Sequence, residues 1–173
     1  MKHTPKRIKR ILKKCLKEIS DHPEFFAKNP QKNFKRKLPF EEVLKLVLSM
    51  AGKSIRGELI DYFGLKLSTP TASALVQQKN KINYSVFEIL FHNFVDAINE
   101  QDLLDGYRLI AMDGSDLHVP INKNEPDFFH QNKNRDKPYN LLHINVLYDL
   151  RKRIYLDFQK YCVFLFFDYI FFL

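Results

Sequence analysis

Tryptophan is absent from this chain, and only 5 glycines and 2 cysteines occur among its 173 residues. Cys15 and Cys162 are too few and too far apart to form a disulfide scaffold or a zinc site, whose ligands come in closely spaced pairs. Positive charge at the amino terminus is not followed by a continuous apolar segment, which argues against a secretory signal. The apolar run at 161–173 is shorter than the roughly 20 residues that cross a bilayer. We therefore expect a cytoplasmic protein without a membrane partner.

Basic residues outnumber acidic ones, with 28 Lys and Arg against 20 Asp and Glu. The excess of positive charge is concentrated at the amino terminus. Residues 1–37 contain 13 of the basic residues, and the acidic residues in this range are only Glu18, Asp21 and Glu24. Such a segment suits a polyanion, most commonly nucleic acid, but it is equally compatible with a solvated arm. RNA or a membrane surface are alternative partners for the basic segment taken alone.

Apolar residues recur at helical spacing through the first hundred residues and predict a series of amphipathic helices. The expected ranges are 6–19, 40–51, 54–63, 70–79 and 85–99. Ser54 and Thr69 are expected N-caps, Pro70 follows at the first helical position, and Ser85 with Glu88 fits a capping box. Gly52 and Gly64 are the expected ends of the second and third helices.

Two polar helix faces are candidates for contact with DNA. The cations of the first helix are Lys6, Arg7, Lys9, Arg10, Lys13, Lys14 and Lys17. The polar positions on and after the fourth helix are Thr71, Ser73, Gln77, Gln78, Lys79 and Lys81. The third and fourth helices would form a helix-turn-helix with an over-long turn, whose second helix reaches phosphates and base edges. A solvated polar face is the alternative.

The pattern changes after Gly106. Short apolar runs predict strands at 108–112, 140–150 and 153–158, so helices are followed by a sheet and the fold class is α+β. Asp113 is expected at the carboxyl end of the first of these strands, with Gly114 allowing a sharp turn and Asp116 three residues later. A carboxylate held there can bind Mg²⁺, although Asp-Gly is also a common turn dipeptide.

Other polar residues of this half give weaker signals. His118, His130 and His143 have spacings of no common metal motif, and ordinary histidines are the simpler interpretation. Ser115 lacks the sequence setting of a hydrolase nucleophile. The basic loop residues can contact a DNA backbone or remain solvated, and they are Lys133, Arg135, Lys137 and the neighbouring Tyr139.

Several segments together resemble one family. The stretches LIAMDGSDLHVP, NEPDFF and KPYNLLHINVLYDLRKRIYLDF, in this order, look like the start of the catalytic core in DDE transposases of the insertion-sequence-four type. The segment TASALVQQKNKI is similar to the DNA-binding region of the same family, so the resemblance covers residues 6–157. It implies an amino-terminal helical DNA-binding region followed by the incomplete start of an RNase H-like α/β core.

The resemblance also implies a chemistry. In the family an Asp, a second Asp and a Glu hold two Mg²⁺ or Mn²⁺ ions that act in phosphoryl transfer at transposon ends, and the first Asp corresponds to Asp113. Asp149, Asp157 and Asp168 lack the setting of the other two ligands. We therefore expect a chain that is catalytically incompetent and does not hold the metal stably by itself. The implied partners are double-stranded DNA of the terminal inverted repeats, and full-length transposase or a second copy of the chain.

The organisation expected from the sequence has four parts. They are 1–39, a basic helix and connector; 40–105, a helix-turn-helix-like DNA-binding region; 106–157, the first core strands; and 158–173, an apolar tail. This tail departs from the family and is compatible with a frameshifted continuation or with a buried terminal strand. An alternative function for the whole chain is a non-enzymatic DNA-binding protein that competes with full-length transposase at the ends.

Overall fold

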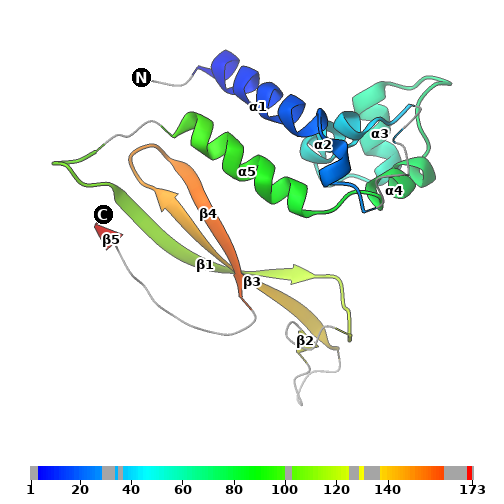
Figure 1. Cartoon of the computed structure of the whole chain (residues 1–173). Coiled ribbons are helices and arrows are strands. Elements are labelled where there is room, and N and C mark those ends of the chain that lie inside the picture. Colours follow the sequence, from blue (N-terminus) through cyan, green and yellow to red (C-terminus); the bar gives the residue numbers. More distant parts are fainter. Residues whose placement is uncertain are drawn as a thin grey trace. The chain divides into compact units, whose positions relative to one another are not determined.

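The computed structural model describes residues 4–28, 34, 37–99, 103–124, 129–130, 137–161 and 171–172. The chain is α+β, with a helical unit, Met1–Ile98, and a unit built on an antiparallel sheet, Asn99–Leu173 (Figure 1). The helices are α1 (Pro5–Ser20), α2 (Phe40–Ser49), α3 (Ile55–Phe63), α4 (Ala72–Lys79) and α5 (Ser85–Ile98), with a 3₁₀ turn at Pro23–Phe25. The strands are β1 (Leu109–Val119), β2 (Phe129–His130), β3 (Tyr139–Asp149), β4 (Ile154–Tyr161) and β5 (Phe171–Phe172).

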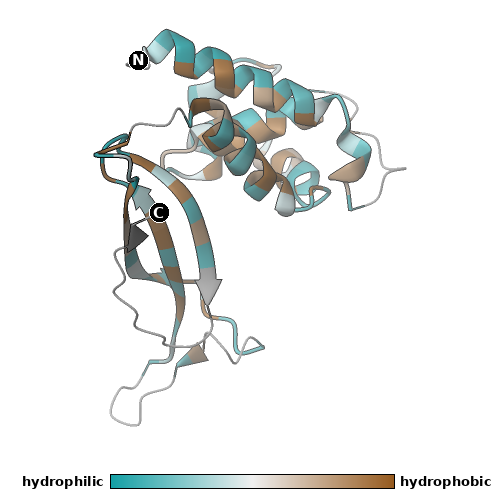
Figure 2. Ribbon diagram, turned by 60° about the vertical axis from the view of Figure 1, so that its left-hand side comes forward, coloured by the Kyte–Doolittle hydropathy of each residue, from teal (hydrophilic) through white to brown (hydrophobic). Residues whose placement is uncertain are grey.

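The first helix forms where the sequence predicts it. Thr4 is the N-cap, its hydroxyl oxygen accepting a hydrogen bond from the Arg7 amide at 3.3 Å, and Pro5 occupies the first helical position. Proline is favourable at this position because the backbone N–H that it lacks would have no acceptor within the first turn of a helix. Cys15, Leu16 and Ile19 are buried on one side of α1, and the opposite side stays polar, as the alternating bands in Figure 2 show.

The core of the helical unit is shared by all five helices. α1 packs against α2 and α5, and α2 packs against α3 and α4. The buried members are Cys15, Leu16, Ile19, Leu38, Phe40, Val43, Leu44, Leu46, Leu59, Leu75, Ile82, Val86 and Leu90. The basic helix α1 is therefore part of the same packed unit as α2 to α5, so its apolar stripe is covered and its cationic face is left outward.

The connection between α2 and α3 is organised by a buried carboxylate. α2 ends at Ser49, three residues before the expected end at Gly52, because Met50 has extended backbone angles. Glu58 is 5% exposed, and its Oε1 accepts hydrogen bonds from the amides of Ala51 at 2.9 Å and Lys53 at 2.7 Å. The apolar Ile55 in the first turn of α3 is exposed, whereas the charged Glu58 is buried. Backbone donors of the connection are the reason, since they need a partner away from water.

Replacing Glu58 with alanine should therefore lower the free energy of unfolding by about 1–3 kcal/mol, because two part-buried amides lose their acceptor. Urea denaturation followed by circular dichroism measures the change. Glu58→Gln, which keeps an oxygen at the same place, should cost less, and Glu18→Ala on the exposed face of α1 serves as the control. Equal stability of Glu58→Ala and the wild type would show that water replaces this acceptor.

The fourth helix begins two residues later than expected. Thr71 is its N-cap, with its hydroxyl oxygen accepting from the Ala74 amide at 3.2 Å. Thr69 has a different role, since its hydroxyl donates to the Gly64 carbonyl at 2.6 Å and accepts from the Lys66 amide at 3.2 Å. Two threonines flank Pro70, and tertiary closure of the α3–α4 connection decides which of them caps the helix.

The fifth helix also has a cap that the sequence pattern missed. Oδ1 of Asn83 accepts from the Ser85 amide at 3.2 Å, so a side-chain partner comes from two residues before the expected capping box. Val86 is fully buried, although the periodic set placed Phe87 and Phe91 inward and left Val86 out.

Three long strands form the centre of the sheet unit. β3 lies in the middle, antiparallel to β1 on one side and to β4 on the other, while β2 and β5 add short pairs to β3 and β1 (Figure 1). The expected strands at 140–150 and 153–158 are confirmed, with β4 continuing to Tyr161, inside what the sequence suggested was an atypical tail. The remainder of that tail, apart from β5, lies outside the described residues.

The expected turn after the first strand is wrong. β1 runs without interruption from Leu109 to Val119, and Gly114 pairs with Asn145 in the middle of the ladder. Gly114 has no positive φ, so its glycine character is not used for a turn. It is needed for space, since a Cβ at this position would lie 2.9 Å from Asn145 Oδ1 and 3.1 Å from the His143 ring. Strand pairing over ten residues of β1 therefore outweighs the local turn preference of Asp-Gly.

Across the described residues, no helix combines the length and the apolar character that crossing a bilayer requires.

Candidate functional site

The cationic face of α1 is the most extended charged surface of the helical unit. Lys6, Lys9, Arg10, Lys13, Lys14 and Lys17 are exposed, and Arg7 is half-buried. An ion pair within this helix, Lys14 with Glu18 at 3.6 Å, joins two largely exposed side chains and is worth little. Lys6 and Lys17 are separated along the axis by about 16 Å. Duplex DNA carries roughly ten phosphates over this length, so the face matches a polyanion in size and in charge.

The polar face of α4 is divided between structural and outward roles. Thr71 caps the helix, while Ser73 and Gln77 are exposed. Gln78 and Lys81 are part-buried and bonded to each other, the Lys81 ammonium donating to Gln78 Oε1 at 3.0 Å. The half-buried Lys79 completes the set that was expected to contact DNA. The structure thus leaves fewer freely directed side chains on this face than the sequence pattern suggested.

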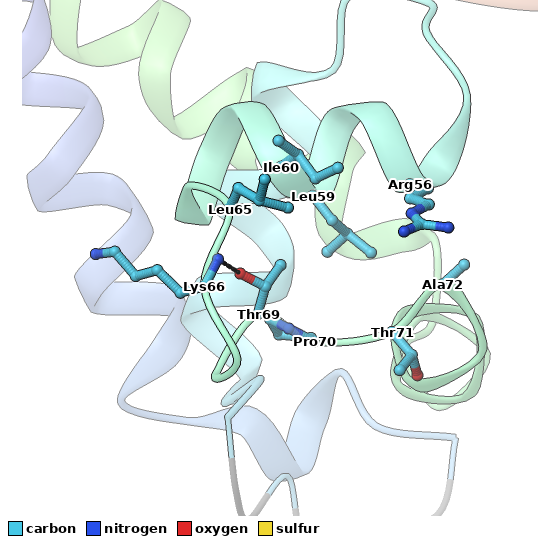
Figure 3. Close-up of a pocket in the computed structure, with 9 residues that line it drawn as sticks. All are labelled: Arg56, Leu59, Ile60, Leu65, Lys66, Thr69, Pro70, Thr71 and Ala72. Atoms are coloured by element: carbon cyan, nitrogen blue, oxygen red, sulfur yellow. Dashed lines mark hydrogen bonds between the residues drawn. The ribbon is translucent and has the colours of Figure 1, made fainter.

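A hollow of about 360 Å³ lies between α3 and the start of α4 (Figure 3). Aliphatic groups such as Leu59, Ile60 and Leu65 line it, with Arg56 beside the first residues of α4, and the Lys66 side chain points away from the other lining residues. The connection of 64–71 creates this hollow because it is too long to close tightly against α3. Leu65 is 82% exposed, which leaves an apolar side chain at the surface of the predicted helix-turn-helix.

Asp113 lies in the middle of β1, paired with Val146 of β3, rather than at a strand end. Alternate residues of a strand point to opposite faces, so Asp113 and Ser115 share one face with Ile144 and Val146, here called the Asp113 face. The Asp113 side chain is exposed, and its Oδ1 accepts from the Gly114 amide at 2.9 Å. The carboxylate is therefore accessible, with apolar cross-strand neighbours.

The opposite side of the same strands carries a hydrogen-bonded cluster, here called the His143 face, made of Gly114, Asp116, His143 and Asn145. Nδ1 of His143 lies 2.7 Å from Asp116 Oδ1, and its Nε2 lies 3.2 Å from Asn145 Oδ1. Asp116 and His143 are direct cross-strand partners. Asp113 and Asp116 consequently lie on opposite faces of the sheet and do not share a cation.

A two-ion centre needs at least three anionic ligands close together. Within the described residues no group of three or more His, Cys, Asp or Glu side chains is placed to hold a metal ion. Asp113 provides one carboxylate, and the apolar side chains of Val146 and Ile144 on the same face provide no oxygen ligand. The donor set that the described residues provide therefore does not fit two divalent ions by itself.

The other residues singled out in the sequence are spread over the sheet. His118 and His130 both lie beside the Tyr139 ring, at centroid distances of 6.1 and 5.5 Å, so these histidines pack on an aromatic ring. Lys137 is exposed just before β3. The expected contacts at Lys133 and Arg135 lie outside the described residues.

A buried network at the β3–β4 turn escaped the sequence analysis. The Asp149 side chain is fully buried and accepts from Arg108 Nε at 2.9 Å and from the amides of Arg151 and Lys152 at 3.0 and 2.9 Å. Asn99 Oδ1 accepts from Arg108 Nη2 at 2.7 Å and from the Lys152 ammonium at 3.1 Å. Burial alone would raise the pKa of Asp149, but the Lys152 amide and Arg108 outweigh it, so the pKa is lowered. This network holds the hairpin to the segment before β1.

Comparisons with protein-family models, with curated proteins and with solved structures find no match for this chain. A function must therefore be argued from the residues and their geometry. The two features available for this are the cationic surface of the helical unit and the accessible Asp113 on the first long strand.

Proposed function

We propose that this chain is part of a DDE transposase of the insertion-sequence-four type, whose helical unit binds double-stranded DNA of the terminal inverted repeats. The observation that carries the proposal is the outward cationic face of α1. Its exposed lysines and Arg10 lie on a helix that is packed against α2 and α5, so the backbone that carries them is ordered before DNA arrives. An ordered backbone loses less conformational entropy on binding than a mobile arm does.

The sheet unit supports the second half of the proposal. An RNase H-like core is proposed to start at β1, and β1, β3 and β4 follow one another as an antiparallel set with β3 in the centre. Asp113 is on the first of these strands, where the family resemblance places the first metal ligand. In such an enzyme Mg²⁺ or Mn²⁺ would supply charge stabilisation at phosphorus. Asp113 would contribute one carboxylate, and further ligands would have to come from outside the described residues.

A DNA-binding role without cleavage is the second candidate. The observation that favours it is that the neighbours on the Asp113 face are apolar and cannot bind a metal ion. The cross-strand neighbour of Asp113 is Val146, and that of Ser115 is Ile144. In this role the chain competes with full-length transposase for the ends, or pairs with it or with a second copy of itself. For both candidates we place the protein in the cytoplasm.

Asp113→Ala separates these roles. The variant should bind DNA carrying the transposon ends with the affinity of the wild type, because Asp113 is outside the cationic surfaces of the helical unit. Neither protein is expected to cleave this DNA with Mg²⁺ or Mn²⁺, since one carboxylate does not make a two-ion site. Binding is measured by fluorescence anisotropy and cleavage by gel electrophoresis.

Each outcome of this experiment assigns a role. Cleavage by the wild type that Asp113→Ala abolishes would show that a second subunit or unrecognised residues complete the metal site. Loss of end binding in a folded Asp113→Ala protein would mean that Asp113 is a binding or structural residue. If the wild type bound no DNA at all, the proposed function would be wrong.

A further inference from the structure

Two lysines lie opposite one another where the segment after α1 meets the segment between α4 and α5. An antiparallel bridge joins Ala27 to Ile82, and the Lys28 amide donates to the Lys81 carbonyl at 2.8 Å. This hydrogen bond places the backbones of Lys28 and Lys81 opposite one another, next to the bridge. Residues in such a pair have Cα atoms about 5.5 Å apart.

Like charges directly opposite in a β pair destabilise it, so this arrangement costs stability unless something compensates. Each ammonium lies over an aromatic ring. The Lys28 Nζ is 4.9 Å from the centroid of Tyr84, and the Lys81 Nζ is 5.8 Å from that of Phe34. Among the described residues, neither ammonium has a carboxylate oxygen within 4.0 Å.

The aromatic rings hold the ammonium groups without neutralising them. A cation over a ring is attracted to the π face and keeps N–H donors that point away from the ring. The Lys81 ammonium is fixed further by Gln78 Oε1 at 3.0 Å. Two cations thus extend from opposite backbone positions, a local conflict of the kind that is found at functional surfaces. An anion between them would remove the repulsion and use both sets of donors.

We propose that Lys28 and Lys81, together with Tyr84, form a clamp for a backbone phosphate of double-stranded DNA at the junction of α4 and α5. The inference rests on the proposed function and adds to it a defined contact that includes Lys28, which no helix pattern indicated. Tyr84 is 54% exposed, so it remains accessible beside the Lys28 ammonium. Lys81 follows directly after α4, whose polar residues Ser73 and Gln77 are exposed, so the clamp orients that helix on the duplex.

The test compares Lys28→Gln/Lys81→Gln with the wild type and with Lys66→Gln. Lys66 is an exposed lysine of the same helical unit that points away from its neighbours in Figure 3, and it controls for loss of general charge. Affinity for a short duplex of arbitrary sequence is measured across a salt series, because phosphate contacts carry no sequence information. The double variant should lower the slope of log K against log salt by about 0.9, because the clamp contacts one phosphate.

A charge-preserving variant, Lys28→Arg/Lys81→Arg, should retain the wild-type slope and keeps the test meaningful if the glutamine variant does not fold. A slope of the glutamine variant equal to that of the wild type, with DNA still bound, would overturn the clamp and leave the proposed function standing. The clamp would also be overturned if Lys66→Gln lowered the slope as much as Lys28→Gln or Lys81→Gln alone. Absence of DNA binding by the wild type would overturn both proposals.

Discussion

Glutamine at four cationic positions of α1, Lys6, Lys9, Arg10 and Lys13, is expected to remove most of the salt dependence of DNA binding. Each lost phosphate contact lowers the slope of log K against log salt by about 0.9, so four contacts lower it by about 3.6. At moderate salt the dissociation constant should rise on the order of 10³-fold. Glutamine has nearly the helix propensity of lysine and arginine, so α1 should remain folded.

The matched control for the α1 variant keeps the positive charge and replaces the lysine ammonium group with the arginine guanidinium group. Arginine at Lys6, Lys9 and Lys13 should preserve the salt slope, because phosphate contacts need a cation rather than a particular side chain. Far-ultraviolet circular dichroism verifies the helical content of both variants. An unchanged slope in the glutamine variant would show that the α1 surface is solvated and that DNA binds elsewhere on the chain.

Asp149→Ala should have the largest effect on stability. The substitution leaves the Arg108 guanidinium, which is 22% exposed, and two backbone amides without their acceptor. Breaking a buried ion pair by removing one partner costs about 3 kcal/mol at the lower end of the usual range. The cost should be local, because the hydrogen bonds that the Asp149 side chain accepts come from Arg108 and from the turn of its own sheet unit.

Hydrogen exchange followed by mass spectrometry measures this local cost. Peptides from β3 and β4 should exchange on the order of 100-fold faster in Asp149→Ala, whereas peptides from α1 and α5 should keep their wild-type rates and serve as an internal reference. Asp113→Ala removes an exposed carboxylate from the same sheet and should leave the exchange of both units unchanged. Unchanged exchange in Asp149→Ala would mean that water replaces the carboxylate in the network.

The Asp149 contribution should also depend on pH. Its pKa is lowered on folding, so the folded state favours the ionised carboxylate. The resulting stability is fully present above the unfolded pKa of about 3.9 and is lost as the pH falls through the folded pKa. The difference in stability between the wild type and Asp149→Asn should therefore be constant near neutral pH and shrink in acid. A difference that grows toward acid would contradict the ion pair.

Local patterns determined the helices and the main strands. The stripe of Ile8, Leu12 and Cys15 repeats at helical spacing and needs only one covered face, so α1 is where the periodicity puts it. The apolar runs of β3 and β4 are likewise close to their expected ranges. The sequence also showed that basic residues are concentrated in residues 1–37, because the number of charges in a segment does not depend on the fold.

Where the local sequence allowed two structures equally well, tertiary contacts decided which of them formed. Thr69 and Thr71 are both good caps, and closure of the α3–α4 connection assigned them. Gly114 is a turn residue by propensity, yet the ten-residue pairing of β1 with β3 keeps it in a strand. That pairing also sends Asp113 and Asp116 to opposite faces, which spacing along the chain could not reveal.

The sequence by itself thus determined the α+β class, the helical face that is cationic, and the residues whose type suits phosphate or metal chemistry. Only the tertiary structure decided which of them meet. Glu58 accepts from amides of the α2–α3 connection, and Asp149 accepts from the distant Arg108 side chain. The Lys28 amide meets the Lys81 carbonyl beside a bridge that joins residues far apart in the chain. Such contacts depend on strand register and chain closure, and neither is encoded in the periodicity of a single segment.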